Sequence, residues 1–255
     1  MVHMTRIITV ASGKGGVGKT TFVSNLATAL ASFKKSVIAV DGNLTTANLG
    51  IHLGIPLYPV TLQDVLNGDA RLNDALYYHP SGFTVLPADI SLKKLRLADT
   101  HELVDVFYKL VGGCDFILVD AAAGLSKEAL SAVEAADELI TVTNPELPAL
   151  TDALKLGNLA EKYGTHNLGV VVNRVRGKDH EFSMEAVENF LEMPILGKIP
   201  EDVEISKSIA KKKPLVAHKP SSPAAQHVMS IAARLIGEDY KPKSNLSYRL
   251  FNWLK

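Results

Sequence analysis

Short apolar segments and longer amphipathic segments alternate along most of the chain. The apolar segments are rich in Val and Ile and continuous rather than alternating, which is typical of strands buried on both faces. They span residues 7–11, 36–40, 83–86, 116–119, 139–142, 168–172 and 195–199. Helical periodicity predicts helices at residues 20–32, 101–111, 126–136, 150–162 and 183–191. This alternation predicts an α/β fold with three αβα layers around a mainly parallel, twisted sheet.

The end of the chain departs from this pattern. No repeat, low-complexity tract or linker precedes residue 211, so residues 1–240 are predicted to form one domain. The lysine triplet 211–213 fits a solvated helix end, where cations favour the helix dipole. Residues 223–236 fit a last packed helix with a proline near its start. Residues 241–255, which begin Lys-Pro-Lys, are predicted to be a hinge and a tail.

Composition and charge exclude several classes of protein. The chain has 255 residues, of which 47% are hydrophobic, and 27 Lys and Arg balance 27 Asp and Glu. This composition is ordinary for a globular protein and excludes collagen-like, coiled-coil and disordered chains. Zero net charge argues against broad nucleic-acid binding.

The sequence also argues against cysteine-dependent and membrane-spanning classes of protein. Cys114 is the only cysteine, which excludes a disulfide framework, a Cys-rich zinc site and an intrachain iron–sulfur cluster, and fits a small buried side chain. The eight histidines show no metal-binding spacing. No apolar stretch approaches the ~20 residues of a transmembrane helix. Because the N-terminus also lacks the apolar core of a signal peptide, we expect a cytoplasmic protein.

A glycine-rich phosphate-binding motif follows the first predicted strand. Gly13, Gly18, Lys19 and Thr20 form a P-loop pattern between a strand and a helix, which is the context this motif requires. Glycines let successive backbone N–H groups point at phosphate oxygens, and the helix N-terminus adds positive potential. We expect Lys19 to reach the β- and γ-phosphates and the Thr20 hydroxyl to bind Mg²⁺. The predicted nucleotide-binding residues of the loop are Gly13, Lys14, Gly15, Gly16, Val17, Gly18, Lys19, Thr20 and Thr21.

A second lysine lies inside this loop, although Lys14 is not needed to bind the phosphates of its own nucleotide. Residues 14–20 resemble the deviant Walker A motif of the MinD/ParA family, whose signature lysine reaches across a dimer to the partner's nucleotide. The resemblance covers nearly the whole chain. Segments 40–49 and 118–124 resemble the family's switch I and switch II, and further matching segments are 143–146, 172–174 and 199–202. The match is strongest to MinD-type proteins of the archaeal branch.

This resemblance implies a P-loop NTPase fold with ATP and Mg²⁺ as cofactors and an ATP-bound homodimer. It also implies that Asn173, Arg174 and Pro200 lie at the adenine. In switch II, Ala122 stands where the family often has proline, which implies a less rigid segment.

Two aspartates end predicted strands. The carboxyl ends of parallel strands lie at the edge that carries the P-loop, so we expect Asp120 to hold Mg²⁺ or its water. A helix-capping role is the alternative for Asp120. Asp41 ends the second strand and resembles a family residue that helps to order the metal shell; a plain turn residue is its alternative. The predicted metal ligands are therefore Thr20 and Asp120.

Asn43 departs from the family pattern, which usually has a second aspartate at this position to position or activate the attacking water. An amide has no basicity and can only orient water. Either the protein hydrolyses ATP slowly, or Asn43 is an engineered trap for the ATP state, or residues 41–43 are turn chemistry alone. The predicted catalytic residues are Lys14, Lys19, Asp41 and Asn43.

The tail has the pattern of an amphipathic helix. Its apolar residues fall on one helical face, and four cations with no acidic side chain follow residue 240. This pattern is typical of an interfacial membrane anchor and is similar to the C-terminal targeting helix of MinD proteins. A last helix packed on the body is the alternative. The predicted membrane-binding residues are Leu246, Leu250, Phe251, Trp253 and Leu254.

Together these features predict a MinD-like ATPase that dimerises around ATP, binds the inner face of the membrane peripherally and positions division or another surface machinery through an unidentified protein partner. Two alternatives stay open. One is a nucleotide-gated scaffold with little turnover, which Asn43 favours. The other is a ParA-type DNA-partition or cargo-partition ATPase, which would need a basic surface in place of the tail.

Overall fold

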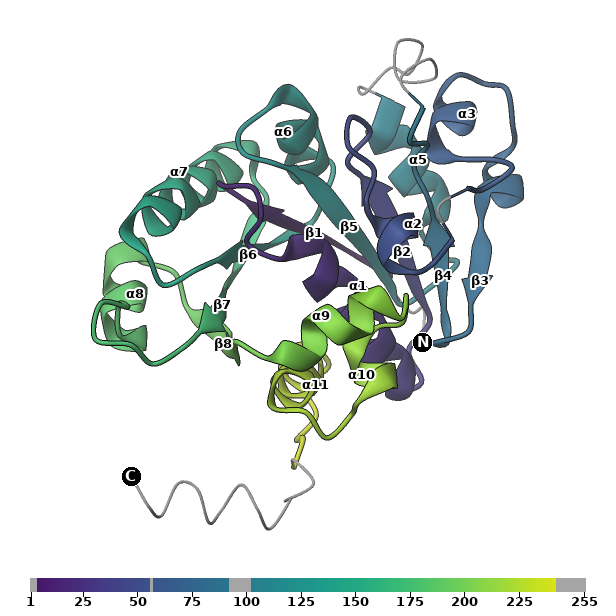
Figure 1. Ribbon diagram of the computed structural model, residues 1–255. Helices are drawn as coiled ribbons and strands as arrows, with labels where there is room; N and C mark the ends of the chain where they lie inside the picture. The colour runs from purple at the N-terminus through teal and green to yellow at the C-terminus, as the bar shows by residue number, and fades with distance from the viewer. Residues whose placement is uncertain (1–3, 56, 92–101, 242–255) are drawn as a thin grey trace.

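The computed structural model describes residues 4–55, 57–91 and 102–241. An eight-stranded sheet with the order β3-β4-β2-β5-β1-β6-β7-β8 forms its centre (Figure 1). Neighbouring strands are parallel apart from the antiparallel pair β3 and β4. The strands are β1 (Arg6–Ser12), β2 (Val37–Gly42), β3 (Tyr77–His79), β4 (Phe83–Leu86), β5 (Phe116–Ala123), β6 (Glu138–Thr143), β7 (His166–Val175) and β8 (Ile195–Pro200).

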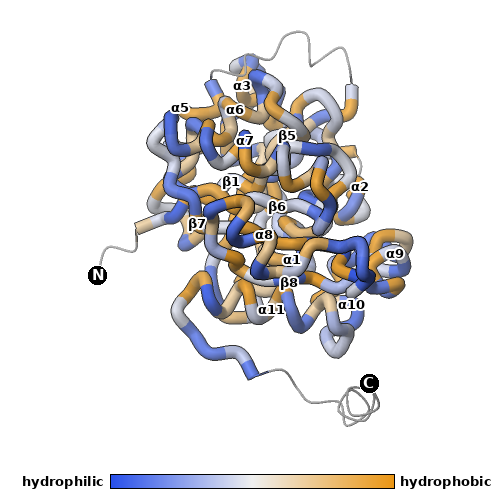
Figure 2. The backbone as a smooth tube through the Cα atoms, turned by 90° about the vertical axis from the view of Figure 1, so that its left-hand side faces the viewer, coloured by the Kyte–Doolittle hydropathy of each residue, from blue (hydrophilic) through white to orange (hydrophobic). Residues whose placement is uncertain are grey.

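Helices cover both faces of this sheet. One face packs against α1 (Lys19–Ser32), α10 (Leu215–His218) and α11 (Pro223–Leu235). The other face packs against α5 (Leu103–Leu110), α6 (Lys127–Glu134) and α7 (Leu147–Tyr163), with α8 (Met184–Leu191) beside α7. In Figure 2 hydrophobic and hydrophilic colours alternate along the helices, as expected where one side of each helix faces the sheet. The predicted three-layer αβα class is confirmed.

Successive residues of β1 show why the strands are continuous apolar runs. Ile8 and Val10 belong to the cluster beneath α1, whereas Ile7 and Ala11 belong to the cluster beneath α5, α6 and α7. All four side chains are at most 1% exposed. Because both faces are covered, none of these four positions faces water, and the alternation of a one-sided sheet is lost.

The structure shifts one predicted helix and adds elements that the pattern did not predict. α7 begins at Leu147 rather than at residue 150, because Pro148 lies in the first turn, where a missing N–H breaks no hydrogen bond. β3 has three residues at the sheet edge, and α2 (Leu49–His52), α3 (Leu62–Leu66), the 3-10 helix η1 (Leu72–Ala75) and α10 are also short. Such lengths are too small for hydrophobic periodicity to show.

The segment after β8 contains the longest element that was missed. α9 (Val203–Ala210) begins after Asp202, whose side chain accepts a hydrogen bond from the Glu204 N–H at 2.9 Å. It ends before Lys211, so the lysine triplet follows a helix end, and its three residues are exposed as predicted. The predicted last helix is confirmed as α11.

The structure also places the single cysteine. Cys114 is buried, as expected. Within the described ranges, no helix is long and apolar enough to cross a membrane, and no group of three or more His, Cys, Asp or Glu side chains is placed to hold a metal. The tail residues Leu246, Leu250, Phe251, Trp253 and Leu254 lie outside the described residues.

Candidate nucleotide-binding site

The P-loop connects β1 to α1 at the carboxyl edge of the sheet. Two of its glycines have left-handed backbone conformations, with φ of 77° at Gly16 and 100° at Gly18, which L-residues rarely adopt. A Cβ at Gly18 would also collide with the Asn173 side chain, and one at Gly13 would collide with the backbone of Asp152 in α7. The glycines are therefore required both by conformation and by the close approach of neighbouring segments.

Lys19 is the first residue of α1, and its side chain folds back over the loop. The residue is 8% exposed, and Nζ donates a hydrogen bond to Ser12 Oγ at 3.0 Å. Ser12 Oγ in turn donates to the Lys14 carbonyl at 2.7 Å. Burial lowers the pKa of the Lys19 ammonium, and the nearby Asp120 carboxylate raises it in part. An ammonium has three hydrogens, so the bond to Ser12 leaves donor capacity for phosphate oxygens.

Asp41 and Asp120 lie side by side on β2 and β5 as register partners, one residue before the end of β2 and three before the end of β5. Asp41 is fully buried and accepts three backbone hydrogen bonds, from Asn43 at 3.2 Å, Asn48 at 3.0 Å and Leu49 at 2.9 Å. Burial raises the pKa of both carboxyl groups, and the charge of Asp120 raises that of Asp41 further. Asp41 therefore shapes the loop after β2 and begins α2.

Asp120 has the features of a cation ligand. It is 1% exposed; the Thr20 hydroxyl donates a hydrogen bond to its carboxylate, while Oδ1 is buried without a hydrogen-bond partner among the described residues. A buried oxygen without a partner is rare in proteins. Hard oxygen donors such as a carboxylate and a hydroxyl are what Mg²⁺ prefers. The predicted pair of Thr20 and Asp120 is brought together and fits a magnesium ion.

The Asn43 side chain is used within its own turn. Its Oδ1 accepts hydrogen bonds from the Thr46 N–H at 3.0 Å and from the Thr46 hydroxyl at 3.1 Å. This geometry is that of an asparagine folding the backbone around itself, as in turn chemistry. It supports the turn interpretation of Asn43, and a role in orienting water stays a prediction.

Lys14 lies on the outer side of the P-loop. Together with Gly15 and Gly16 it is exposed, whereas Val17 and Lys19 are buried. Switch II contacts this loop through the Gly124 N–H, which donates to the Ser12 carbonyl at 2.9 Å. The exposed position leaves the Lys14 ammonium in contact with solvent, and its role across a dimer stays a prediction.

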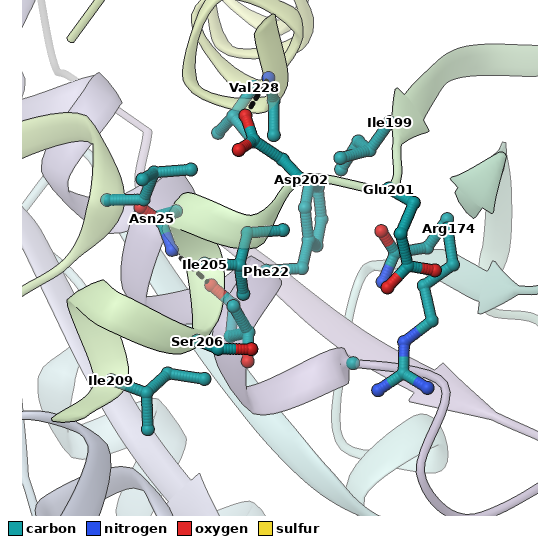
Figure 3. Close-up of a pocket in the computed structure, with 15 residues that line it drawn as sticks. Phe22, Asn25, Arg174, Ile199, Glu201, Asp202, Ile205, Ser206, Ile209 and Val228 are labelled. Atoms are coloured by element: carbon teal, nitrogen blue, oxygen red, sulfur yellow. Dashed lines mark hydrogen bonds between the residues drawn. The ribbon is translucent and has the colours of Figure 1, made fainter. Parts of the chain in front are cut away.

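A pocket adjoins the P-loop where α1, the end of β7 and the segment after β8 meet (Figure 3). Asn173 and Arg174 line it, as predicted for the adenine site. Asn173 Nδ2 donates to the Val17 carbonyl at 2.6 Å, which ties the pocket to the P-loop. Arg174 has a φ of 57°, a left-handed conformation for a non-glycine residue. Pro200 is not among the lining residues, although the residues on either side of it are.

Segment 199–202 of this pocket was singled out from the sequence, and the walls that the helices supply were missed. The remaining walls of the pocket come from α1, α9, α10 and α11 and from the segment after β8, and the lining residues include Phe22, Asn25, Ile199, Glu201, Asp202, Ile205, Ser206, Ile209 and Val228 (Figure 3). Asn25 was the available signal, because an amide close to Phe22, Val23 and Leu26 on a buried helix needs a specific hydrogen-bond partner. It is 4% exposed, and its Oδ1 accepts from the Val216 N–H of α10 at 2.9 Å.

Comparisons with known proteins identify this arrangement. A family model described as the CobQ/CobB/MinD/ParA nucleotide binding domain matches residues 8–215. The chain belongs to this family of nucleotide-binding domains.

Its relatives within the family are MinD proteins and archaeal ATP-binding proteins. An uncharacterised ATP-binding protein of Methanocaldococcus jannaschii is 44% identical over 93% of this chain and 90% of its own length. The septum site-determining protein MinD of Pyrococcus horikoshii, solved in complex with Mg-ADP, is 41% identical with a TM-score of 0.88, over 91% of this chain and 96% of that one. MinD from a MinC:MinD complex of Aquifex aeolicus is 31% identical with a TM-score of 0.82, over 94% and 99%.

Proposed function

We propose that this chain is an ATPase of the MinD type that uses Mg-ATP to join two copies of itself and to bind the membrane, and thereby places cell-division or another surface machinery. The observation that carries the proposal is the P-loop itself. It buries Lys19 beside Thr20 and Asp120 and exposes Lys14. Similarity to a MinD solved with Mg-ADP supports ATP and Mg²⁺ as the cofactors.

Each buried group has a role that follows from its position. Backbone N–H groups of residues 13–18 and the Lys19 ammonium bind phosphate oxygens at the start of α1. Thr20 and Asp120 would hold Mg²⁺, which would supply positive charge to the phosphate oxygens. Asp41 orders loop 43–48 by accepting the N–H groups of Asn43 and Asn48, and Asn43 orients the attacking water through its amide.

The base and ribose then extend from the P-loop into the adjoining pocket. Asn173 lies between the P-loop and the pocket. Its side-chain amide donates to the Val17 carbonyl of the P-loop and also lines the pocket. The Phe22 ring and Ile205 offer an apolar surface for a planar base (Figure 3). Ile199 and Glu201, the neighbours of Pro200, complete the wall beside Arg174 (Figure 3).

The exposed location of Lys14 supports dimerisation. In the ATP-bound dimer its ammonium binds the nucleotide of the partner subunit, so the bound nucleotide bridges the two copies. The relative from Aquifex aeolicus is in a complex with MinC. That complex supports a protein partner for this chain as well, whose identity is open; the zero net charge does not favour nucleic acid.

Membrane binding is assigned to residues 241–255. A short amphipathic helix with four cations binds an anionic surface weakly and reversibly. Two such tails on one dimer strengthen attachment by on the order of 10²–10⁴ without new contacts. The protein is therefore cytoplasmic when monomeric and peripheral on the inner membrane face when ATP joins two copies.

ATP turnover with and without anionic liposomes tests this function. Turnover that needs Mg²⁺ and responds to liposomes supports it, and the Lys19→Met variant, which removes the phosphate-binding ammonium, is the control. Turnover of the wild-type protein no greater than that of Lys19→Met would contradict the ATPase function.

A second candidate is a nucleotide-gated scaffold that binds ATP and scarcely hydrolyses it. The specific observation in its favour is the pair of hydrogen bonds from Thr46 to Asn43 Oδ1, which holds the amide in the turn. Under this alternative the liposome experiment gives ATP-dependent dimers and membrane binding with negligible phosphate release.

A further inference from the structure

A bidentate contact joins the loop after β2 to helix α6. Thr45 donates its backbone N–H to Glu128 Oε1 at 3.0 Å and its hydroxyl to Glu128 Oε2 at 2.7 Å. Glu128 is 9% exposed, whereas Thr45 is exposed at the tip of the loop. Both oxygens of the Glu128 carboxylate thus accept hydrogen bonds from Thr45, which lies 83 positions away in the sequence.

The contact lies between the two segments that flank the proposed metal site. The loop 43–48 starts and ends on the Asp41 carboxylate, which accepts the N–H groups of Asn43 and Asn48. α6 follows the end of β5, which carries Asp120, and the same connection is bonded to the P-loop through Gly124. Figure 1 shows α6 beside β2 and β5 at this edge of the sheet.

A role in stabilising α6 alone does not explain this geometry. An acidic residue in a first helical turn favours the helix dipole wherever its side chain points. Here Ser126 already caps the helix by accepting from the Ala129 N–H at 3.2 Å. The Glu128 carboxylate instead turns to Thr45 and satisfies both oxygens there. Hydrogen bonds to a charged acceptor are stronger than neutral ones, and two in parallel also fix direction.

Loop 43–48 also has hydrogen bonds that do not involve α6, so the fold of the loop and its position against α6 depend on different contacts. Asn43 Oδ1 binds Thr46, and Asp41 binds the two ends of the loop, independently of α6. Removing the Glu128 carboxylate would therefore leave the turn formed and release it from α6. What changes is where Asn43 lies relative to the P-loop.

We infer that Glu128 is a positioning residue: through Thr45 it holds loop 43–48 against α6, so that Asn43 keeps the position that the proposed hydrolysis requires. This inference rests on the proposed ATPase function and assigns its site a residue that acts through another. A positioning role lowers kcat while leaving ATP affinity nearly unchanged. The bond joins Thr45 to Glu128, whereas ATP binds to the P-loop and the adenine pocket, which the bond does not involve.

The test uses the full chain and matched variants. Glu128→Ala removes both bonds and Thr45→Val removes only the hydroxyl, whereas Thr45→Ser keeps both. Glu134→Gln changes an exposed acidic residue at the other end of α6 and is the control. For each variant, kcat and KM for ATP are measured, together with hydrogen–deuterium exchange of the peptide that covers residues 43–48.

We expect Glu128→Ala to lower kcat about tenfold, the rate equivalent of roughly one charge-assisted hydrogen bond, with KM within about twofold of wild type. Thr45→Val gives a smaller loss, Thr45→Ser restores the rate, and Glu134→Gln changes nothing. Exchange at residues 43–48 becomes faster in Glu128→Ala and stays at the wild-type rate in Thr45→Ser and Glu134→Gln.

Two results would overturn the inference: an unchanged kcat in Glu128→Ala, or a loss of kcat that Thr45→Ser shows equally. Exchange at residues 43–48 that is the same in Glu128→Ala as in wild type would overturn the contact itself. If the wild-type chain has no turnover, the proposed function fails, and the exchange measurement alone then decides whether Glu128 holds the loop.

Discussion

At the scale of single residues, the site depends on three buried charges that lie together. Lys19, Asp41 and Asp120 are 8%, 0% and 1% exposed. Burial of a charge is costly unless the group is paired or hydrogen-bonded. Asp41 meets this requirement with three backbone N–H groups, and Lys19 with Ser12 and the charge of Asp120. The carboxylate oxygen that is left over on Asp120 is the position that a metal would satisfy.

Asn43 is the residue whose replacement should most change the chemistry. We expect Asn43→Asp to raise ATP turnover by about tenfold or more, since a positioned general base contributes on the order of 10²–10⁴ in rate. An aspartate oxygen can still accept both hydrogen bonds from Thr46, so the turn is retained. The measurement is steady-state phosphate release under conditions where both proteins dimerise, together with the lifetime of the dimer, which should shorten.

Asn73→Asp is the control for this prediction, because it adds the same charge at an exposed asparagine outside the loop. Equal turnover of Asn43→Asp and wild type would mean that position 43 does not contact the attacking water. In the wild-type protein, slow turnover should leave ATP itself bound after purification.

At the scale of elements, the antiparallel edge strand β3 has a pH-sensitive junction with β4. His79 is 5% exposed and stacks on Phe83, with ring centroids 4.9 Å apart. Its Nδ1 accepts a hydrogen bond from the Ser81 N–H at 3.1 Å, which requires that nitrogen to be unprotonated. Burial lowers the pKa of His79 below its ordinary value of 6.5, and a backbone hydrogen bond with Leu53 raises it in part. The folded state therefore favours the neutral ring.

The sign of the pH effect follows from this lowered pKa. The unfolded chain binds the proton more readily, so the contribution of His79 is present above about pH 6.5 and is lost as pH falls toward the folded-state pKa. We expect His79→Gln to flatten the fall in the free energy of unfolding between about pH 7 and pH 5. Urea denaturation at several pH values measures this. As a control, His180→Gln, which replaces an exposed histidine, should keep the wild-type dependence of the free energy of unfolding on pH.

At the scale of the whole molecule, the two lysines of the P-loop have different predicted roles: the buried Lys19 in nucleotide binding and the exposed Lys14 in dimerisation. We expect Lys14→Ala to keep most of its nucleotide affinity, because Lys19 and the loop backbone hold the phosphates of the same subunit. It should lose ATP-dependent dimerisation. Light scattering with ATP and with ADP measures the mass, and Lys109→Ala, which removes an exposed lysine in α5, is the control. A Lys14→Ala protein that dimerises like wild type would show that this lysine acts within its own subunit.

Attachment to the membrane is a property of two copies rather than of one. We expect the full chain to sediment with anionic liposomes in ATP and much less in ADP, because one tail binds marginally and two bind on the order of 10²–10⁴ more tightly. A chain truncated after Lys243 should not sediment with either nucleotide. Neutral liposomes give the background. Equal sedimentation in ATP and ADP, or sedimentation of the truncated chain, would return the tail to the packed-helix alternative.

The sequence by itself determined the parts of this protein that are contiguous. The P-loop could be recognised because a phosphate cradle is built by consecutive backbone N–H groups of residues 13–18, followed at once by a helix. The layers were predictable because strands buried on both faces read as continuous apolar runs. Asp41 and Asp120 could be placed at one edge because parallel strands end together, as their register then showed.

Only the tertiary structure decided what distant segments build together. The pocket beside the P-loop takes its walls from six separate elements. Short helices such as α10 have too few residues to show a helical period in the sequence. The bond between Thr45 and Glu128 joins residues whose proximity depends on β2 lying next to β5 in the sheet. Side-chain partners across strands follow from strand order, and strand order is set by packing of the whole chain, which no local pattern of residues encodes.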